Sequence, residues 1–88
     1  MDEKTVEREV VKRVKEEGGI AYKFTSPNRR SVPDRLCLLP GGKILFVECK
    51  RPGAKVTQLQ AREHERLRAM GFEVVVVDNK EDANALPL

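Results

Sequence analysis

Asp34, Glu48 and Lys50 are the residues whose types and spacing could carry out chemistry in this sequence. Residues 34–39 and 43–50 are rich in β-forming residues and are separated by Pro-Gly-Gly, so they predict the two strands of a β-hairpin. In an antiparallel hairpin, the start of the first strand lies beside the end of the second. We therefore expect the Asp34 and Glu48 carboxylates to be neighbours.

Alternation along the second strand places Glu48 and Lys50 on the same face as Ile44 and Phe46. Two converging carboxylates repel each other, and a shared proton or a hard divalent cation relieves that repulsion. Oxygen ligands without Cys or His favour Mg²⁺ or Mn²⁺. Lys50 could help to deprotonate a water and stabilise negative charge at phosphorus. This pattern fits phosphodiester hydrolysis.

Each of these residues also has a simpler interpretation. Glu48 and Lys50 could be solvated charges at the point where the strand leaves the core. An acidic residue after Pro33 is ordinary turn chemistry, and Asp34 could serve only that purpose.

A helix is predicted over about residues 4–17, because Val6, Val10 and Val14 recur at helical spacing and Gly-Gly follows. Glu7 falls about 100° from Val6 around this helix, inside the valine stripe. A carboxylate on a core face is costly unless it is paired or bound to a cation. A nearby Lys or Arg would satisfy Glu7 as well as a metal would.

A second helix is predicted over about residues 57–70, with Leu59, Leu67 and Met70 on its apolar stripe and Gln60 at the border. The Gln60 amide could bind a water or a substrate phosphate, or it could be satisfied by the backbone. The single histidine, His64, has no Cys or His at ligand spacing, which argues against a thiolate metal site.

Residues 20–24 and 72–78 read as two more strands, so the order is helix, three strands, helix, strand. This order favours an α/β fold with a mixed sheet flanked by helices. With 88 residues the chain forms one domain, residues 1–88, with a core over about 5–78 and a polar tail over 79–88.

Charge and hydropathy exclude some classes of protein. The net charge of +3 is compatible with a polyanionic partner. No apolar run exceeds four residues and the N-terminus is charged, so we expect an intracellular protein that neither crosses a membrane nor is secreted. Cys37 and Cys49 lie in apolar runs and are expected to be reduced core residues.

The arrangement Glu7, Pro33-Asp34, Glu48-Cys49-Lys50 and Gln60 resembles the PD-(D/E)XK nuclease superfamily, whose restriction-endonuclease-like core has the same order of elements. Over about residues 5–78 the sequence looks more closely like the virus-type replication-repair nuclease (VRR-NUC) family. It looks like one of the small stand-alone members of this family that bacteriophages encode.

The resemblance implies a metal-dependent DNA endonuclease (a hydrolase). Mg²⁺ or Mn²⁺ would be bound by Asp34, Glu48 and the main-chain carbonyl of Cys49, with Glu7 as a further ligand, often through water. Lys50 would be the catalytic lysine, and Gln60 the polar residue from the second helix. The resemblance also implies a homodimer that cuts branched DNA, such as four-way (Holliday) junctions, in repair or recombination.

Two basic segments are where we expect the DNA backbone to be held. They contribute Arg29, Arg30, Arg35, Arg51 and Lys55. Each of these residues could instead belong to a solvated charged loop.

Two other functions stay open. The chain could be a non-catalytic module of the same fold that binds nucleic acid or protein, although intact motif residues argue against this. It could also be an RNA-directed or sequence-specific nuclease, but only three Phe and one Tyr are available for base stacking.

Overall fold

The structure, a computed structural model, describes residues 1–88 and contains three helices and four strands. In chain order these are α1 (Glu3–Glu16), β1 (Ile20–Lys23), β2 (Arg35–Leu39), β3 (Lys43–Cys49), α2 (Gln58–Ala69), β4 (Glu73–Val77) and α3 (Lys80–Asn84). The strands form one sheet in the order β1-β2-β3-β4. β3 pairs antiparallel with β2 and parallel with β4, so the predicted mixed sheet is confirmed.

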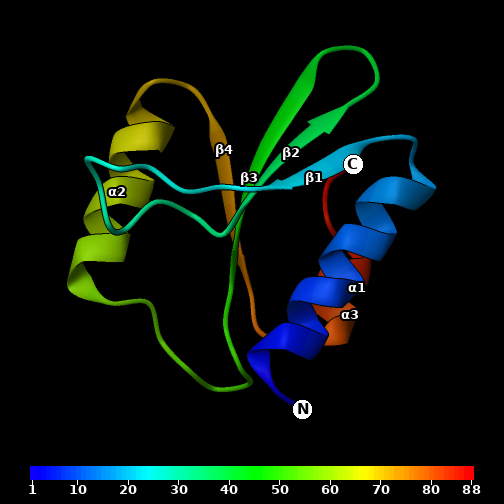
Figure 1. Cartoon of the computed structure of the whole chain (residues 1–88), viewed down its shortest axis with the longest axis horizontal. Helices are drawn as coiled ribbons and strands as arrows, with labels where there is room; N and C mark the ends of the chain where they lie inside the picture. The colour runs from blue at the N-terminus through cyan, green and yellow to red at the C-terminus, as the bar shows by residue number, and fades with distance from the viewer.

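The sheet lies between two helical layers (Figure 1). α1 and α3 lie together on one side, and α2 lies on the other. None of the helices combines the length and the apolar character that a membrane span requires.

α1 is fixed at both ends by local sequence. The Asp2 side chain caps its start by accepting a hydrogen bond from the Thr5 N–H at 2.8 Å. Beyond its end, a Cβ on Gly19 would lie 2.6 Å from the Leu38 carbonyl oxygen. Only glycine allows that close approach to β2.

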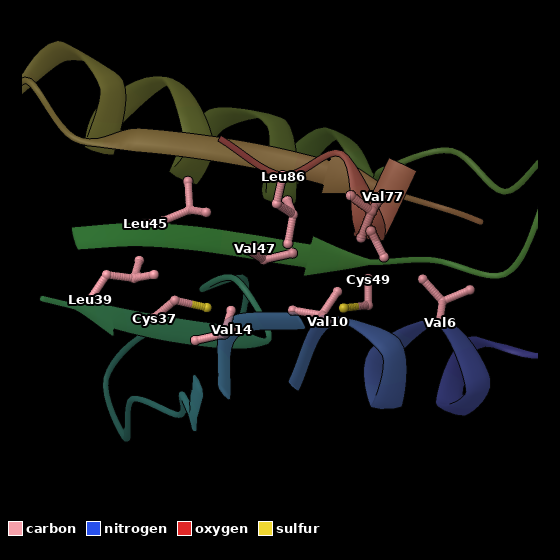
Figure 2. Close-up of a cluster of buried hydrophobic side chains, with 11 residues drawn as sticks. Val6, Val10, Val14, Cys37, Leu39, Leu45, Val47, Cys49, Val77 and Leu86 are labelled. Atoms are coloured by element: carbon pink, nitrogen blue, oxygen red, sulfur yellow. The ribbon is translucent and has the colours of Figure 1, made fainter. Parts of the chain in front are cut away.

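The main core lies between α1 and one face of the sheet. Val6, Val10 and Val14 are fully buried, in one cluster with Leu45, Val47 and Cys49 of β3 (Figure 2). Full burial of a valine side chain contributes roughly 1.5–3 kcal/mol, which is sufficient to hold α1 in place. The core also takes in Cys37 and Cys49, which are buried free thiols, as predicted.

Residues 79–88, interpreted from the sequence as a polar tail with about one helical turn, contain that turn as α3 and also pack into the core. Asn79 caps α3 by accepting from the Asp82 N–H at 2.8 Å, and α3 packs on α1. Ala83 and Leu86 are buried in the main core. The two buried residues give no helical pattern in the sequence, because their burial depends on the contact between α3 and α1.

A smaller cluster of Phe46, Leu67 and Val74 lies under α2. The apolar stripe predicted for this helix is wrong in part, because Leu59 and Met70 are 61% and 60% exposed. α2 packs over β3 and β4, where Leu67 contacts Phe46 and Val74. On the same face of the sheet β1 and β2 are left open, so that Ile20, Tyr22 and Leu38 are exposed.

Candidate functional site

Asp34 and Glu48 meet at the end of the β2–β3 hairpin. Asp34 directly precedes β2, and its Oδ2 accepts a hydrogen bond from the Cys49 N–H at 2.8 Å. Cys49 follows Glu48 at the end of β3, so this bond holds the Asp34 carboxylate beside Glu48. The hairpin therefore makes the two acidic residues neighbours, as the turn predicts.

Glu48 is buried although it is acidic, with only 2% of its surface exposed. Burial raises the pKa of its carboxyl to about 8, and the adjacent Asp34 contributes to the rise, whereas the positive charge of Lys50 opposes it. In the absence of a cation, the folded chain therefore keeps a proton on Glu48 at neutral pH.

The start of α2 orients Gln60 toward Glu48. Thr57 and Gln60 form a capping box, in which the Gln60 side-chain oxygen accepts from the Thr57 N–H at 2.9 Å. The Gln60 amide nitrogen is thereby left free to donate to Glu48 Oε2 at 3.3 Å. The Gln60 oxygen is thus satisfied by the backbone, one of the two interpretations of the sequence, and its nitrogen contacts the Glu48 carboxylate.

His64 is a site residue that the sequence analysis missed. Its side chain is 1% exposed, and its Nε2 lies 3.5 Å from Glu48 Oε1. Burial lowers the pKa of His64, so the imidazole is neutral at pH 7. The available signal was the i, i+4 spacing of Gln60 and His64, which places both side chains on one face of a helix.

The Cys49 carbonyl points toward the edge of β2, where it has no main-chain partner. The Lys50 N–H donates to the Val77 carbonyl of β4 at 2.9 Å. Because successive residues of a strand direct their main-chain groups to opposite sides, the N–H and C=O of Cys49 point away from β4, toward β2. Continuing the β2–β3 register places Pro33 opposite Cys49. Proline has no N–H to donate.

Glu7 lies on the other face of the sheet and is already paired. Arg35 Nε donates to Glu7 Oε2 at 2.8 Å, and Lys23 Nζ lies 3.3 Å from the same oxygen. The structure therefore does not bring Glu7 together with Glu48, and the ion pair satisfies the carboxylate within the valine stripe. Arg35, predicted to bind DNA, pairs with Glu7 and also donates to the Ala21 carbonyl at 3.1 Å.

Individual known proteins, rather than a family model, identify the family of this chain, because no family model matches it. The chain is 55% identical over 85 residues to "Putative nuclease p44" of Acyrthosiphon pisum secondary endosymbiont phage 1, a match that covers 97% of this chain and 91% of that protein. A solved structure titled "VRR_NUC domain" matches with a TM-score of 0.90 and 36% identity, over 96% of this chain and 91% of that one. The chain belongs to the VRR-NUC family. It is a phage-type member, as its motifs predicted.

The predicted basic residues of this VRR-NUC protein fall into two groups. Arg30, Arg51 and Lys55 are exposed and form no ion pair, whereas Arg29, which is also exposed, lies 3.5 Å from Glu63, a partly buried acidic residue of α2. A groove of about 340 Å³ is lined by Asp34 together with Lys23, Phe24, Thr25, Ser26, Arg29, Arg30 and Val32. A larger open groove of about 730 Å³ runs along α1 and contains none of Asp34, Glu48, Lys50 and Gln60.

The VRR-NUC site offers a small set of oxygen donors. No group of three or more His, Cys, Asp or Glu side chains is placed to hold a metal ion. The donors brought together are the Asp34 and Glu48 carboxylates and the Cys49 carbonyl, a set that suits a hard divalent cation. Glu48 Oε1 is buried without a hydrogen-bond partner, and a cation would satisfy it.

Proposed function

We propose that this VRR-NUC protein is a Mg²⁺- or Mn²⁺-dependent endonuclease that hydrolyses phosphodiester bonds in branched DNA, four-way junctions in particular. It would act as a homodimer inside the host cell, in recombination or repair. Family membership and the phage relative named as a nuclease support the reaction class. The observation that carries the proposal is the pair of adjoining carboxylates, Asp34 and Glu48, with one Glu48 oxygen buried and unpartnered.

Asp34, Glu48 and the Cys49 carbonyl would hold the cation. When bound, the cation would lower the pKa of a coordinated water and neutralise charge that develops at phosphorus. The Asp34 carboxylate is held in place by the Cys49 N–H, and the Glu48 carboxylate by Gln60, so both ligands are oriented before substrate arrives.

Lys50 would supply a positive charge at the reacting phosphate. It immediately follows β3, on the same face as Glu48, and its charge acts on the pKa of the Glu48 carboxyl. A lysine ammonium beside a reacting phosphate can stabilise a developing oxyanion and assist proton removal from the attacking water.

The groove beside Asp34 would receive the DNA backbone. Arg29 and Arg30 line it, and the Arg29 guanidinium is held near Glu63 at 3.5 Å. Arg51 and Lys55 follow Lys50 in an exposed loop whose Gly53 N–H is anchored on Asp78 at 3.0 Å. Positively charged side chains on both sides of the carboxylates would position a phosphodiester between them.

The open half of the sheet supports the homodimer. Leu38 pairs with Ile20 on β1 and with Ile44 on β3, so these three side chains form one row on the face that α2 leaves uncovered. They are 41%, 55% and 38% exposed, and Tyr22 in the next row is 50% exposed. A second copy would bury this apolar row, and a twofold dimer would present two sites to a four-way junction.

The test is a cleavage assay on linear, flap, splayed and four-way DNAs, each with Mg²⁺, with Mn²⁺ and with EDTA. We expect metal-dependent cutting with a preference for the four-way DNA. Asp34→Asn and Glu48→Gln should each abolish cutting while the variants still melt cooperatively. Undiminished cutting by either variant, or equal cutting in EDTA, would refute the proposal.

A further inference from the structure

His64 and Glu48 present two buried polar atoms to each other without forming a hydrogen bond. Glu48 Oε1 and His64 Nε2 are the two buried side-chain atoms of the chain that have no partner. They are 3.5 Å apart, whereas a typical N–H···O hydrogen bond is about 2.9 Å. An unpaired buried polar group costs roughly 1–3 kcal/mol. A small rotation of either side chain would bring the two atoms within hydrogen-bond distance.

The other Glu48 oxygen is already held from the same helix. Gln60 Nε2 donates to Oε2, and Gln60 is itself fixed by its capping box with Thr57. Gln60 and His64 are one helical turn apart, so α2 directs two nitrogen atoms at the two oxygens of one carboxylate. Leu67, in the next turn, packs on Phe46 and Val74 and holds this side of α2 against the sheet.

We propose that His64 is a positioning residue for Glu48. Its Nε2–H donates a hydrogen bond to Glu48 Oε1, the one Glu48 oxygen that lacks a partner. With Gln60 on Oε2, this bond fixes the plane of the carboxylate. A carboxylate has about four acceptor sites, so one on each oxygen remains for a cation. The inference rests on the proposed function, because it concerns how the proposed cation ligand is oriented.

Histidine suits this role for a structural reason. A ligating carboxylate that is free to rotate must be ordered when the ion binds, whereas a carboxylate held by two donors is ordered beforehand. The imidazole ring is rigid beyond two side-chain torsions and is locked by burial at 1% exposure. Loss of an outer hydrogen bond of this kind typically lowers metal affinity or activity about 10- to 100-fold.

The first experiment is calorimetric titration of Mg²⁺ into the DNA-free protein at pH 8. We expect His64→Leu, which fills the space without a donor, to bind Mg²⁺ about 10- to 100-fold more weakly than wild type. His64→Gln places an amide N–H at a similar reach and should recover most of the affinity. Thermal melts in EDTA serve as the folding control, because His64→Leu removes a buried polar group and should melt no lower than wild type.

The second experiment uses the fact that His64 is the single histidine of the chain. Selective ¹⁵N labelling of histidine gives one imidazole, and its two-bond ¹H–¹⁵N correlations report which ring nitrogen is protonated. We expect the Nε2–H form in the presence of Mg²⁺, with a proton that exchanges more slowly than in Glu48→Ala. A merely space-filling histidine would show no such dependence on Glu48.

The outcomes separate the two proposals. If wild type binds no Mg²⁺ and cuts no DNA, the proposed function fails, and the role of His64 toward a cation fails with it. If wild type binds Mg²⁺ and cuts DNA, but His64→Leu does both equally well, only the positioning role is overturned. An unprotonated Nε2 in the Mg²⁺-loaded protein would overturn it as well.

Discussion

Glu48→Gln should make the metal-free protein more stable at alkaline pH. The amide is neutral at every pH and can donate to Asp34, as a protonated Glu48 would. Glu48 is 2% exposed, and burial beside Asp34 raises its pKa from 4.5 to about 8. Between these two pH values the folded chain holds a proton that the unfolded chain has released, so the free energy of unfolding falls as the pH rises.

The size of the effect follows from that pKa. Raising a carboxyl pKa from 4.5 to about 8 costs roughly 5 kcal/mol at alkaline pH, at 1.36 kcal/mol for each pH unit. From pH 6.5 to 8, wild type should lose roughly 2 kcal/mol. This is a large share of the 5–15 kcal/mol typical of a domain and corresponds to roughly 10 °C in melting temperature. Burial of His64 lowers its pKa from 6.5, so this residue makes the fold more stable as the pH rises, and a fall in the free energy of unfolding over this window comes from Glu48.

The assay is urea unfolding in EDTA at several pH values between 6.5 and 8. Wild type should show the fall in the free energy of unfolding, whereas Glu48→Gln should show no fall and should be the more stable protein at pH 8. Mg²⁺ at pH 8 should then restore stability to wild type alone, because ion binding removes the proton and compensates the charge. Parallel pH profiles for the two proteins would refute the assignment of the buried proton to Glu48.

Three further outcomes are expected. Glu7→Gln weakens the pair with Arg35 and should cost roughly 1–2 kcal/mol in urea unfolding while the Mn²⁺-induced rise in melting temperature persists; loss of that rise would make Glu7 a cation ligand after all. Leu38→Glu should sediment as a 10.0 kDa monomer, whereas Leu59→Glu, an equally apolar and more exposed position on α2, should keep the dimer. Arg30→Ala should weaken binding to junction DNA in EDTA and lower the slope of log affinity against log salt by about one, as measured by fluorescence anisotropy. An unchanged slope would place Arg30 outside the interface.

The features that depend on local sequence were predictable. Valine spacing defines α1, and the Pro-Gly-Gly turn defines the hairpin, so the boundaries of these elements lie within a residue or two of the predicted ones. The adjacency of Asp34 and Glu48 was predictable for the same reason, because a short turn fixes which ends of two strands meet.

The features that depend on which elements face each other were not predictable. The sequence allows Glu7 to bind a metal cation or to pair with a Lys or Arg side chain. The position of Arg35 on β2, beside α1, decides for the ion pair. The rotation of α2 exposes Leu59 and buries His64, whereas the apolar residues of the helix predict a different buried face. The spacing of His64 from other Cys or His residues in the sequence does not reveal its neighbour, because that neighbour is the Glu48 carboxylate on β3.

The bond between Asp34 and the Cys49 N–H has a consequence for folding. A hairpin that slipped by one residue would turn every side chain of β3 to the opposite face, and Asp34 could no longer accept from Cys49. The same hydrogen bond therefore selects the native pairing and sets the separation of the two acids. Replacing Asp34 with alanine would risk register errors in addition to removing a ligand. Asparagine, which retains an acceptor oxygen, separates the loss of charge from the loss of strand alignment.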